Sequence, residues 1–363
     1  MTTSVIHDAT KQPAGHVETK NTTCYMCACR CGIRVTLRDN EVRYIQGNPD
    51  HPLNKGVICA KGSSGIMKQY SPARLTKPLK RREGADRGTS DFEVISWEEA
   101  FKIMEDRLRH IRETDPKKFA LFTGRDQMQA LTGMFAKNFG TPNYAAHGGF
   151  CSVNMAAGMI YTIGGSFWEF GGPDLERSKL FLMFGTAEDH HSNPMKIELS
   201  KFKRNGGRFI SINPIRTGYS AIADEWVPIK PGTDIALLLA WMNVIVGEGL
   251  YDREYLEAYA YGFEQLAEHV KPYTPEWAYT RTGLDPDQIR RTARMMAGAR
   301  PATLVHPGRH VTWYGNDTQR TRAIAILNAL LGSWGRKGGF FVPATMQIPP
   351  YEYPGYLDHE AEV

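Results

Sequence analysis

Apolar residues in this chain fall into short continuous runs and longer stretches with helical spacing. The runs predict buried strands at 118–123, 178–185, 208–213, 226–229 and 302–306. The longer stretches predict helices at 96–112, 128–139, 195–205, 234–246 and 317–331. The first helix begins with Ser96-Trp97-Glu98-Glu99, the pattern of a capping box. Strands that alternate with helices predict a parallel, doubly wound α/β fold.

The ends of these strands are where a ligand is expected. In open parallel sheets, ligands bind beyond the carboxyl ends of the strands. The loops that follow Phe122, Phe184, Ile212 and His306 are therefore the expected binding rim. The chain contains neither a G-x-x-x-x-G-K-[ST] motif nor a G-x-G-x-x-G between a strand and a helix. This argues against the common nucleotide-binding folds.

A different pattern precedes the α/β region. Residues 1–19 are polar and aperiodic, which predicts a flexible tail. Apolar and polar residues alternate over 33–37 and 42–44, so we expect a β-hairpin with its turn at 39–40. Because residues 20–77 contain little apolar material, they predict a small domain that needs a metal centre to fold.

Four cysteines in this small domain have the spacing of metal ligands. Cys24, Cys27 and Cys31 form C-x2-C-x3-C, and Cys59 follows after 27 intervening residues. Four thiolates suit a [4Fe–4S] cluster, whereas a zinc site is usually built from two short cysteine pairs. The lone fourth cysteine favours iron–sulfur, and zinc remains the alternative. Cys29 lies between two ligands, and C-x-C spacing predicts that it points away from the site.

Composition limits the class of protein. With 363 residues, 42% of them apolar and 23% charged, the chain should form two or three globular domains. No apolar run reaches about 18 residues, which predicts no membrane-spanning helix and no direct membrane insertion. The start of the chain has no signal-peptide pattern and six cysteines do not suggest a disulfide framework, so we expect a cytoplasmic location. A net charge of +5 with scattered basic residues gives little support for nucleic-acid binding.

With these elements in place, the chain from about Thr22 to Phe340 resembles the catalytic large subunit of the molybdopterin oxidoreductase (DMSO reductase) family. The cysteine pattern that ends in Cys59-Ala60-Lys61-Gly62 resembles the iron–sulfur signature of that family. Residues 122–124 resemble a strand-end loop that meets a pterin. Segments 212–217, 223–224 and 231–234 resemble the dinucleotide-binding segments, with Asn213 where the family usually has Asp, and 332–339 resembles another recurrent segment.

The resemblance implies a [4Fe–4S] cluster and one molybdenum atom held by two molybdopterin guanine dinucleotides (bis-MGD). Cys151, in HGGFCSVNM, stands where a side chain commonly completes the molybdenum shell, although a buried core cysteine is the alternative. Lys61 resembles the lysine between the cluster and the nearer pterin. The cofactor-binding residues implied are Lys61, Gly185, Asn193, Asn213, Pro214, Thr217, Gly232, Thr233, Asp234, Gly308 and His310.

The same resemblance suggests an activity and partners. Cys151, with His147 and Arg125 as polar groups that would hold an oxyanion, implies oxygen-atom transfer to a sulfur oxyanion, with sulfite to sulfate as the first choice. A polysulfide, thiosulfate or nitrate-type reductase is the alternative, and a tungsten-dependent hydratase is conceivable. The expected partners are a membrane-anchor subunit together with an iron–sulfur electron-transfer subunit. The substrate would be a small inorganic oxyanion.

The resemblance also predicts how the chain divides. Residues 20–77 would form the [4Fe–4S] domain and 78–340 the α/β domains. About 143–300 would build one Rossmann-like unit, and 78–142 with 300–340 the other. Residues 341–363 are rich in Pro and Tyr, and no segment resembles the C-terminal barrel of the family. The chain therefore resembles the N-terminal portion of a longer enzyme, and a truncated, non-catalytic iron–sulfur fragment is a further alternative.

Overall fold

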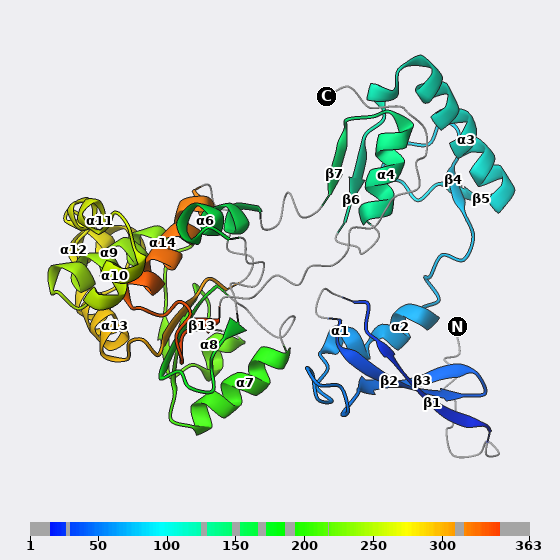
Figure 1. Cartoon of the computed structure of the whole chain (residues 1–363). Helices are drawn as coiled ribbons and strands as arrows, with labels where there is room; N and C mark the ends of the chain where they lie inside the picture. Colours follow the sequence, from blue (N-terminus) through cyan, green and yellow to red (C-terminus); the bar gives the residue numbers. More distant parts are fainter. Residues whose placement is uncertain are drawn as a thin grey trace.

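The structure is a computed structural model. It describes residues 15–26, 30–124, 129–146, 153–165, 172–185, 193–216, 218–308 and 316–341. Three groups of elements can be followed along the chain in Figure 1, coloured blue, cyan to green, and green to orange-red. The chain is therefore of the mixed α/β class that its patterning predicts, and each group is taken in turn.

The first group is a small antiparallel sheet with two short helices. Its strands β1 (Val17–Thr23), β2 (Gly32–Arg38) and β3 (Glu41–Gly47) lie in the order β1-β2-β3. The helices α1 (Ala60–Ser63) and α2 (Gly65–Tyr70) follow. The hairpin of β2 and β3 is confirmed, and its turn residues Asp39 and Asn40 have positive φ angles of 51° and 64°.

Strand β1 was not expected from the sequence. It begins at Val17, inside the stretch predicted to be a tail, and pairs with β2 from Val17↔Arg38 to Thr23↔Gly32. The sequence VETKNTT lies at the edge of the sheet and is mostly exposed. An edge strand that faces water has no apolar alternation to reveal it, and polar residues there discourage pairing with other chains.

The second group lies between residues 79 and 146. It contains an antiparallel pair, β4 (Leu79–Arg81) with β5 (Phe92–Val94), and a parallel pair, β6 (Leu121–Thr123) with β7 (Tyr144–Ala146). The helices are α3 (Trp97–Thr114), the 3₁₀ helix η1 (Pro116–Lys118) and α4 (Gln129–Phe139). Ser96 caps α3, since its hydroxyl oxygen accepts a hydrogen bond from the Glu99 N–H at 3.0 Å. The strand expected from residue 118 is shorter because η1 occupies its beginning.

The third group holds the parallel sheet. Its four strands are β9 (Leu180–Phe184), β10 (Arg208–Ile212), β11 (Glu225–Val227) and β12 (Thr303–His306), in the order β11-β10-β9-β12. All pairs in the sheet are parallel, as the alternation of strands and helices predicts. β10 lies on one side of β9 and β12 on the other, so the strand order reverses beside β9. Ligands bind at such switch points in open α/β sheets.

β12 does not lie where the predicted division of the chain puts it. Residues 300–340 were expected to join 78–142 in a second unit, but β12 pairs with β9, from Thr303↔Leu180 to His306↔Met183. Helix α14 (Asp317–Leu330), in the same stretch, packs against β12 and α9. Hydrophobic patterning identifies a buried strand, but it carries no information on which strand will be its neighbour. The remaining domain limits stay predictions.

Helices cover this sheet and bury a large apolar core. The helices are α6 (Val153–Ile163), α7 (Asn193–Arg204), α8 (Tyr219–Ile222), α9 (Asp234–Gly247), α10 (Arg253–Tyr259), α11 (Phe263–Val270), α12 (Pro275–Thr282), α13 (Pro286–Gly298) and α14. A small antiparallel pair, β8 (Gly172–Pro173) with β13 (Phe340–Phe341), belongs to the same group. The strands β9 and β10 and helix α9 supply most of the fully buried large side chains. In the described parts of the chain, no helix is long and apolar enough to cross a membrane.

Candidate cofactor site

The antiparallel pairing of β1 with β2 brings two of the four cysteines together. Cys24 follows β1 and Cys31 precedes β2, and the Cys24 N–H donates to the Cys31 carbonyl oxygen at 2.8 Å. Both side chains are buried. Cys59 precedes helix α1, and a methyl group on Gly62 of that helix would lie 3.4 Å from Sγ of Cys24. The helix that follows Cys59 therefore packs directly on Cys24.

A buried asparagine fixes this arrangement. Asn54 is 1% exposed, and its side-chain oxygen accepts from the Gly32 N–H at 2.9 Å. Its amide group donates to the carbonyl oxygens of Gly32 (3.0 Å) and Val57 (2.9 Å). Asn54 thus joins the residue after Cys31 to the segment that leads to Cys59. The sequence analysis did not identify Asn54. Its position in the loop between the candidate ligands Cys31 and Cys59 was the signal that could have indicated it.

The surroundings of the cysteines suit an iron–sulfur cluster. Cys24, Cys31 and Ile33 form a small apolar cluster, against which Met26, Val35, Ile45 and Ile58 pack. Among the residues that the structure describes, no three His, Cys, Asp or Glu side chains could hold one metal ion together. A cubane cluster does not require such convergence, because each of its thiolates binds a different iron. Cys27 and Cys29 lie outside the described residues.

Lys61 lies in α1, two residues after Cys59, and is partly buried. Its carbonyl oxygen accepts a hydrogen bond from the Ser64 hydroxyl at 3.1 Å. No ion pair of Lys61 occurs within the described stretches. The ammonium group is therefore not used by the local fold, and it stays a candidate for contact with a bound group.

A second set of candidate residues lies at the carboxyl ends of the parallel strands. Gly185 follows β9 with a φ angle of 55°, and its N–H donates to the Ile212 carbonyl oxygen at 2.8 Å. Gly308 lies two residues beyond β12, and its N–H donates to Nδ1 of His306 at 3.0 Å. Both glycines have the positive φ that favours glycine. They border the switch point between β9 and β12.

Asn213 and Pro214 follow β10 at the same edge of the sheet. Asn213 is buried, and its side-chain oxygen accepts from the Ile215 N–H at 3.1 Å, which shapes a tight turn. Its carbonyl oxygen accepts from Nε1 of Trp226 at 2.7 Å. An asparagine at this position can therefore form the turn that the strand end requires.

The turn 232–234 begins helix α9. Gly232 has a φ angle of 76°, and the Thr233 hydroxyl donates to the Lys230 carbonyl oxygen at 2.7 Å. Asp234 is the first residue of α9, and its Oδ2 lies 3.3 Å from Nε of Arg320. Burial raises the pKa of the Asp234 carboxyl above its usual value, and the Arg320 guanidinium opposes this shift.

Arg320 is a buried residue that sequence reasoning missed. Its side chain is 2% exposed, and its Nη2 donates to the carbonyl oxygen of Pro307 at 3.0 Å. Within the part of the chain that the structure describes, Nη1 has no hydrogen-bond partner, whereas Nε has the ion pair with Asp234. The available signal was an arginine on the apolar face of α14, one turn before Ile324 and two before Leu327. A buried donor without a partner beside a switch point fits a ligand that brings a hydrogen-bond acceptor.

Several candidates lie outside the described residues, namely Arg125, His147, Cys151, Thr217 and His310, as does Cys27. In the chain, Arg125 follows β6, while His147 and Cys151 connect β7 to α6. Asn193 is the first residue of α7, so its position in the backbone is described. The candidate catalytic residues therefore all follow parallel strands, and their roles stay predictions.

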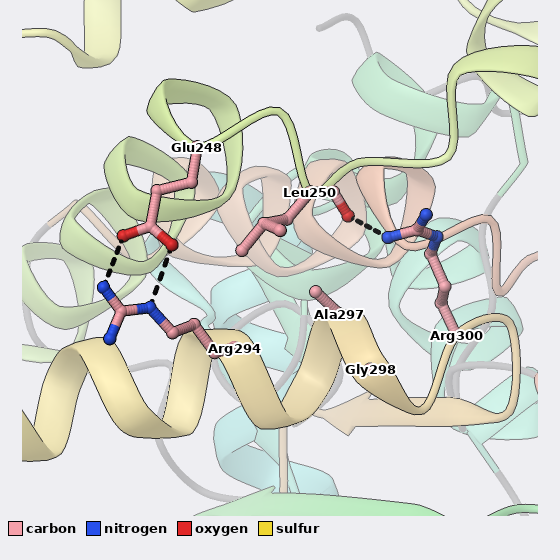
Figure 2. Close-up of a pocket in the computed structure, with 6 residues that line it drawn as sticks. All are labelled: Glu248, Leu250, Arg294, Ala297, Gly298 and Arg300. Atoms are coloured by element: carbon pink, nitrogen blue, oxygen red, sulfur yellow. Dashed lines mark hydrogen bonds and ion pairs between the residues drawn. The ribbon is translucent and has the colours of Figure 1, made fainter.

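A separate pocket lies between the C-terminal ends of α9 and α13 and has a volume of about 540 Å³. Figure 2 shows Arg294 forming a two-pronged ion pair with Glu248, with nitrogen–oxygen distances of 2.9 and 2.8 Å. Arg300 donates to the Leu250 carbonyl oxygen. None of the predicted site residues lines this pocket. Because its charged groups already pair with each other or with backbone, we interpret it as a structural feature.

Comparison with known proteins gives two matching family models. The model described as molybdopterin oxidoreductase Fe4S4 domain matches residues 17–71, and the one described as molybdopterin oxidoreductase matches residues 74–348. The first match begins at β1 and ends just after α2. The second covers the parallel sheet and all of its helices.

The chain is also similar to individual proteins. It is 52% identical to a sulfite dehydrogenase subunit of Allochromatium vinosum, over 94% of this chain and 45% of that protein. It is 33% identical to the thiosulfate reductase molybdopterin-containing subunit PhsA of Salmonella typhimurium, over 88% and 41%. Among solved structures, acetylene hydratase from Pelobacter acetylenicus matches with a TM-score of 0.72 and 27% identity, over 86% of this chain and 43% of that one. The chain thus spans less than half the length of these relatives.

Proposed function

Because the chain belongs to the molybdopterin oxidoreductase family, we propose that it is the cofactor-bearing part of an enzyme that oxidises sulfite to sulfate. The observation that carries this proposal is the 52% identity to a sulfite dehydrogenase subunit over 94% of the chain. In the reaction, sulfite and water give sulfate, two protons and two electrons. The [4Fe–4S] domain at the start of the chain would accept these electrons and transfer them to a partner.

The cofactor is proposed to be molybdenum with two molybdopterin guanine dinucleotides. When bound, this group supplies oxygen-atom exchange and accepts two electrons. The strand-end residues Gly185, Asn213-Pro214 and Gly308, with the turn at 232–234, would hold the dinucleotide part. Support comes from their common location at the carboxyl edge of one sheet and from the Nη1 donor of Arg320 beside it, which has no partner among the described residues.

The candidate catalytic residues have distinct proposed roles. Cys151 would supply a thiolate ligand to the metal, a soft donor that suits molybdenum. Arg125 and His147 would bind the oxyanion through charge-assisted hydrogen bonds and orient it. Lys61 would place its ammonium beside the cluster, where a cation stabilises an added electron.

Partners and location belong to the same proposal. The two relatives are named as subunits, one of them as molybdopterin-containing, which supports a complex of several chains. We propose that the direct partner is an iron–sulfur electron-transfer subunit, with a membrane-anchor subunit beyond it. The proposed location of this chain is the cytoplasm.

Reduction of thiosulfate or polysulfide is the second candidate, favoured by the similarity to thiosulfate reductase. A nitrate reductase of Symbiobacterium thermophilum is 31% identical, so a nitrate-type activity is a weaker alternative. A fragment that binds the cluster without catalysis is a third candidate, and the match of the Fe4S4 domain model to residues 17–71 supports its cluster.

Substrate specificity and metal content together test these alternatives. The native enzyme that contains this chain is purified without oxygen, and sulfite-dependent reduction of a dye or quinone analogue is measured. We expect sulfite oxidation, with molybdenum and iron present, and its loss in Cys151→Ser. Reduction of thiosulfate by a reduced viologen, without sulfite oxidation, would favour the second candidate. About four iron atoms per chain without molybdenum would favour the cluster-bearing fragment, and zinc in place of iron would contradict the cluster itself.

A further inference from the structure

Arg320 contacts three different elements from a single buried guanidinium. Its Nη2 donates to the Pro307 carbonyl oxygen, beyond the end of β12, at 3.0 Å. Its Nε lies 3.3 Å from Oδ2 of Asp234, at the start of α9. Its Cζ lies 5.2 Å from the centre of the Phe184 ring, at the end of β9. One side chain on α14 therefore ties together the ends of β9, β12 and α9.

Each of these contacts adjoins a candidate cofactor-binding residue. Pro307 precedes Gly308, and Phe184 precedes Gly185, so Arg320 touches both borders of the switch point. Asp234 is itself the last residue of the turn at 232–234. The spacing between these three segments is therefore set by the same guanidinium.

Helix α14 also sets the position of α6. A methyl group on Gly158 of α6 would lie only 2.6 Å from Cβ of Thr321 and 2.8 Å from the Thr318 carbonyl oxygen. The two helices are in close contact because Gly158 has no side chain. Since α6 begins two residues after Cys151, the helix that carries Arg320 also supports the segment with the proposed molybdenum ligand.

Stability alone does not explain an arginine at this position. Nη1 is buried without a hydrogen-bond partner among the described residues, Nε has only its ion pair with Asp234, and burial lowers the pKa of the Arg320 guanidinium. Asp234 and Asp317, which lie near it, are themselves largely buried carboxylates. Buried ion pairs of this kind contribute little net stability, because removing the charges from water costs about as much as their attraction returns.

We propose that Arg320 is a positioning residue, which fixes the ends of β9, β12 and α9 relative to one another and so sets the geometry of the cofactor site at the switch point. The proposal rests on the proposed function, because it assumes a molybdenum–pterin group at this edge of the sheet. Arg320 acts through Pro307, Asp234 and Phe184 and takes no part in the reaction.

The test compares Arg320→Lys with the unmodified native enzyme, both purified without oxygen. Lysine keeps the charge, but a single ammonium group does not reproduce the planar fork that reaches Pro307 and Asp234 together. We expect normal iron content, about tenfold less molybdenum and guanine nucleotide per chain, and an altered Mo(V) EPR line shape in the molecules that retain the metal. Guanine nucleotide is measured after acid release, independently of activity.

Arg294→Lys is the matched control. Arg294 forms a two-pronged ion pair with Glu248 at the end of α9, at 2.9 and 2.8 Å, and neither residue adjoins a candidate segment. Molybdenum and guanine nucleotide should stay at the unmodified level in this variant. If Arg320→Lys does not accumulate as folded protein, Arg320→Gln, which keeps a donor for Pro307 and removes the buried charge, takes its place.

Two results would overturn the inference. Unchanged molybdenum, guanine nucleotide and EPR line shape would show that the guanidinium does not set the site. Loss of iron and of circular dichroism together, in both Arg320 variants, would assign Arg320 to the stability of the whole fold. Absence of molybdenum and guanine nucleotide from the unmodified enzyme is a different outcome, because it contradicts the proposed function directly.

Discussion

Asn54 forms hydrogen bonds with three backbone groups of the segments that carry the cysteines. Its side chain uses both its oxygen and its amide group on Gly32 and Val57, at distances of 2.9 to 3.0 Å. Buried polar groups of the main chain must be paired. The Gly32 carbonyl oxygen also accepts from the Asn48 N–H at 2.9 Å, whereas the Gly32 N–H and the Val57 carbonyl oxygen pair with Asn54. A residue that is not a ligand thus sets the distance between Cys31 and Cys59.

Replacement of Asn54 by Ala should therefore weaken both the fold and the cluster site. Leaving these buried backbone groups unpaired should lower the free energy of unfolding by about 1–3 kcal/mol. Iron content per chain should fall with it, because Cys59 is no longer held near Cys24. Urea unfolding and iron analysis measure the two effects. Asn21→Ala, at an exposed position of β1, is the control; equal losses in both variants would contradict the role given to Asn54.

The lowered pKa of His306 predicts that the free energy of unfolding depends on pH. Burial lowers the pKa of His306 from 6.5 to about 4, and Nδ1 accepts a hydrogen bond from the Gly308 N–H. In the unfolded chain His306 binds a proton below pH 6.5, whereas in the folded chain it does so only near pH 4. The contribution of neutral His306 to the free energy of unfolding is therefore fully present above pH 6.5 and is lost as the pH falls from 6.5 to about 4.

The variant His306→Asn isolates this effect. Asparagine supplies an oxygen acceptor for Gly308 but does not titrate, so the fall in stability between pH 6.5 and 4 should be smaller than in the unmodified chain. Chemical unfolding at a series of pH values gives both curves. Parallel curves would mean that His306 titrates normally in the folded protein.

At the scale of elements, helix α3 has an unusual surface. None of its 18 residues is buried, although its sequence is amphipathic. Trp97, Phe101 and Met104 are 57%, 61% and 57% exposed and share one face, and the Trp97 and Phe101 rings lie 5.8 Å apart. The parallel pair β6–β7 beside it has only two strands. Parallel sheets are normally covered by other elements on both faces. In this group the two strands and α3 bury fewer apolar side chains than such a sheet normally does.

Replacement of Phe101 by Lys tests whether this face is open to water. The free energy of unfolding should change by no more than about 0.5 kcal/mol, since an exposed ring contributes little. Binding of a hydrophobic dye such as ANS should fall, because the apolar stripe is interrupted. The matched control is Tyr261→Lys, which alters a fully exposed aromatic residue elsewhere and should leave dye binding unchanged. A large loss of stability in Phe101→Lys would show that the ring is covered in solution.

At the scale of the whole molecule, the described residues form two separate apolar cores. The large core joins the sheet of β9 to β12 with its helices, and the small one contains Cys24, Cys31 and Ile33. Two of the three buried residues of the small core are proposed cluster ligands. We therefore predict that the N-terminal group depends on its metal centre for stability, whereas the sheet does not.

Removal of iron should affect these parts differently. After chelation, residues 17–71 should become sensitive to protease, while the sheet around β9 stays protected. Limited proteolysis followed by mass spectrometry locates the cleavage sites. Reconstitution with iron and sulfide should restore protection. Unchanged protection of residues 17–71 without iron would show that the small apolar core keeps this group folded without a metal centre.

The sequence by itself determined the types of the main elements, and it predicts the donor set of the cluster. The apolar runs at 180–184 and 208–212 are buried on both faces, so they are unambiguous as strands. The spacing of the four cysteines can be read directly from the sequence, and the Fe4S4 domain model matches residues 17–71, the stretch that contains them. The edge strand β1 was missed because its residues face water and carry no apolar pattern.

Only the tertiary structure decided which segments meet. That β12 pairs with β9, and so creates the switch point, depends on contacts between residues more than 120 positions apart. Arg320 likewise owes its neighbours to the tertiary packing, because Asp234 lies at the start of α9 and Pro307 in the loop after β12. Periodicity records whether a residue is buried, but the identity of its neighbour follows from the packing of the whole core, which no local pattern contains.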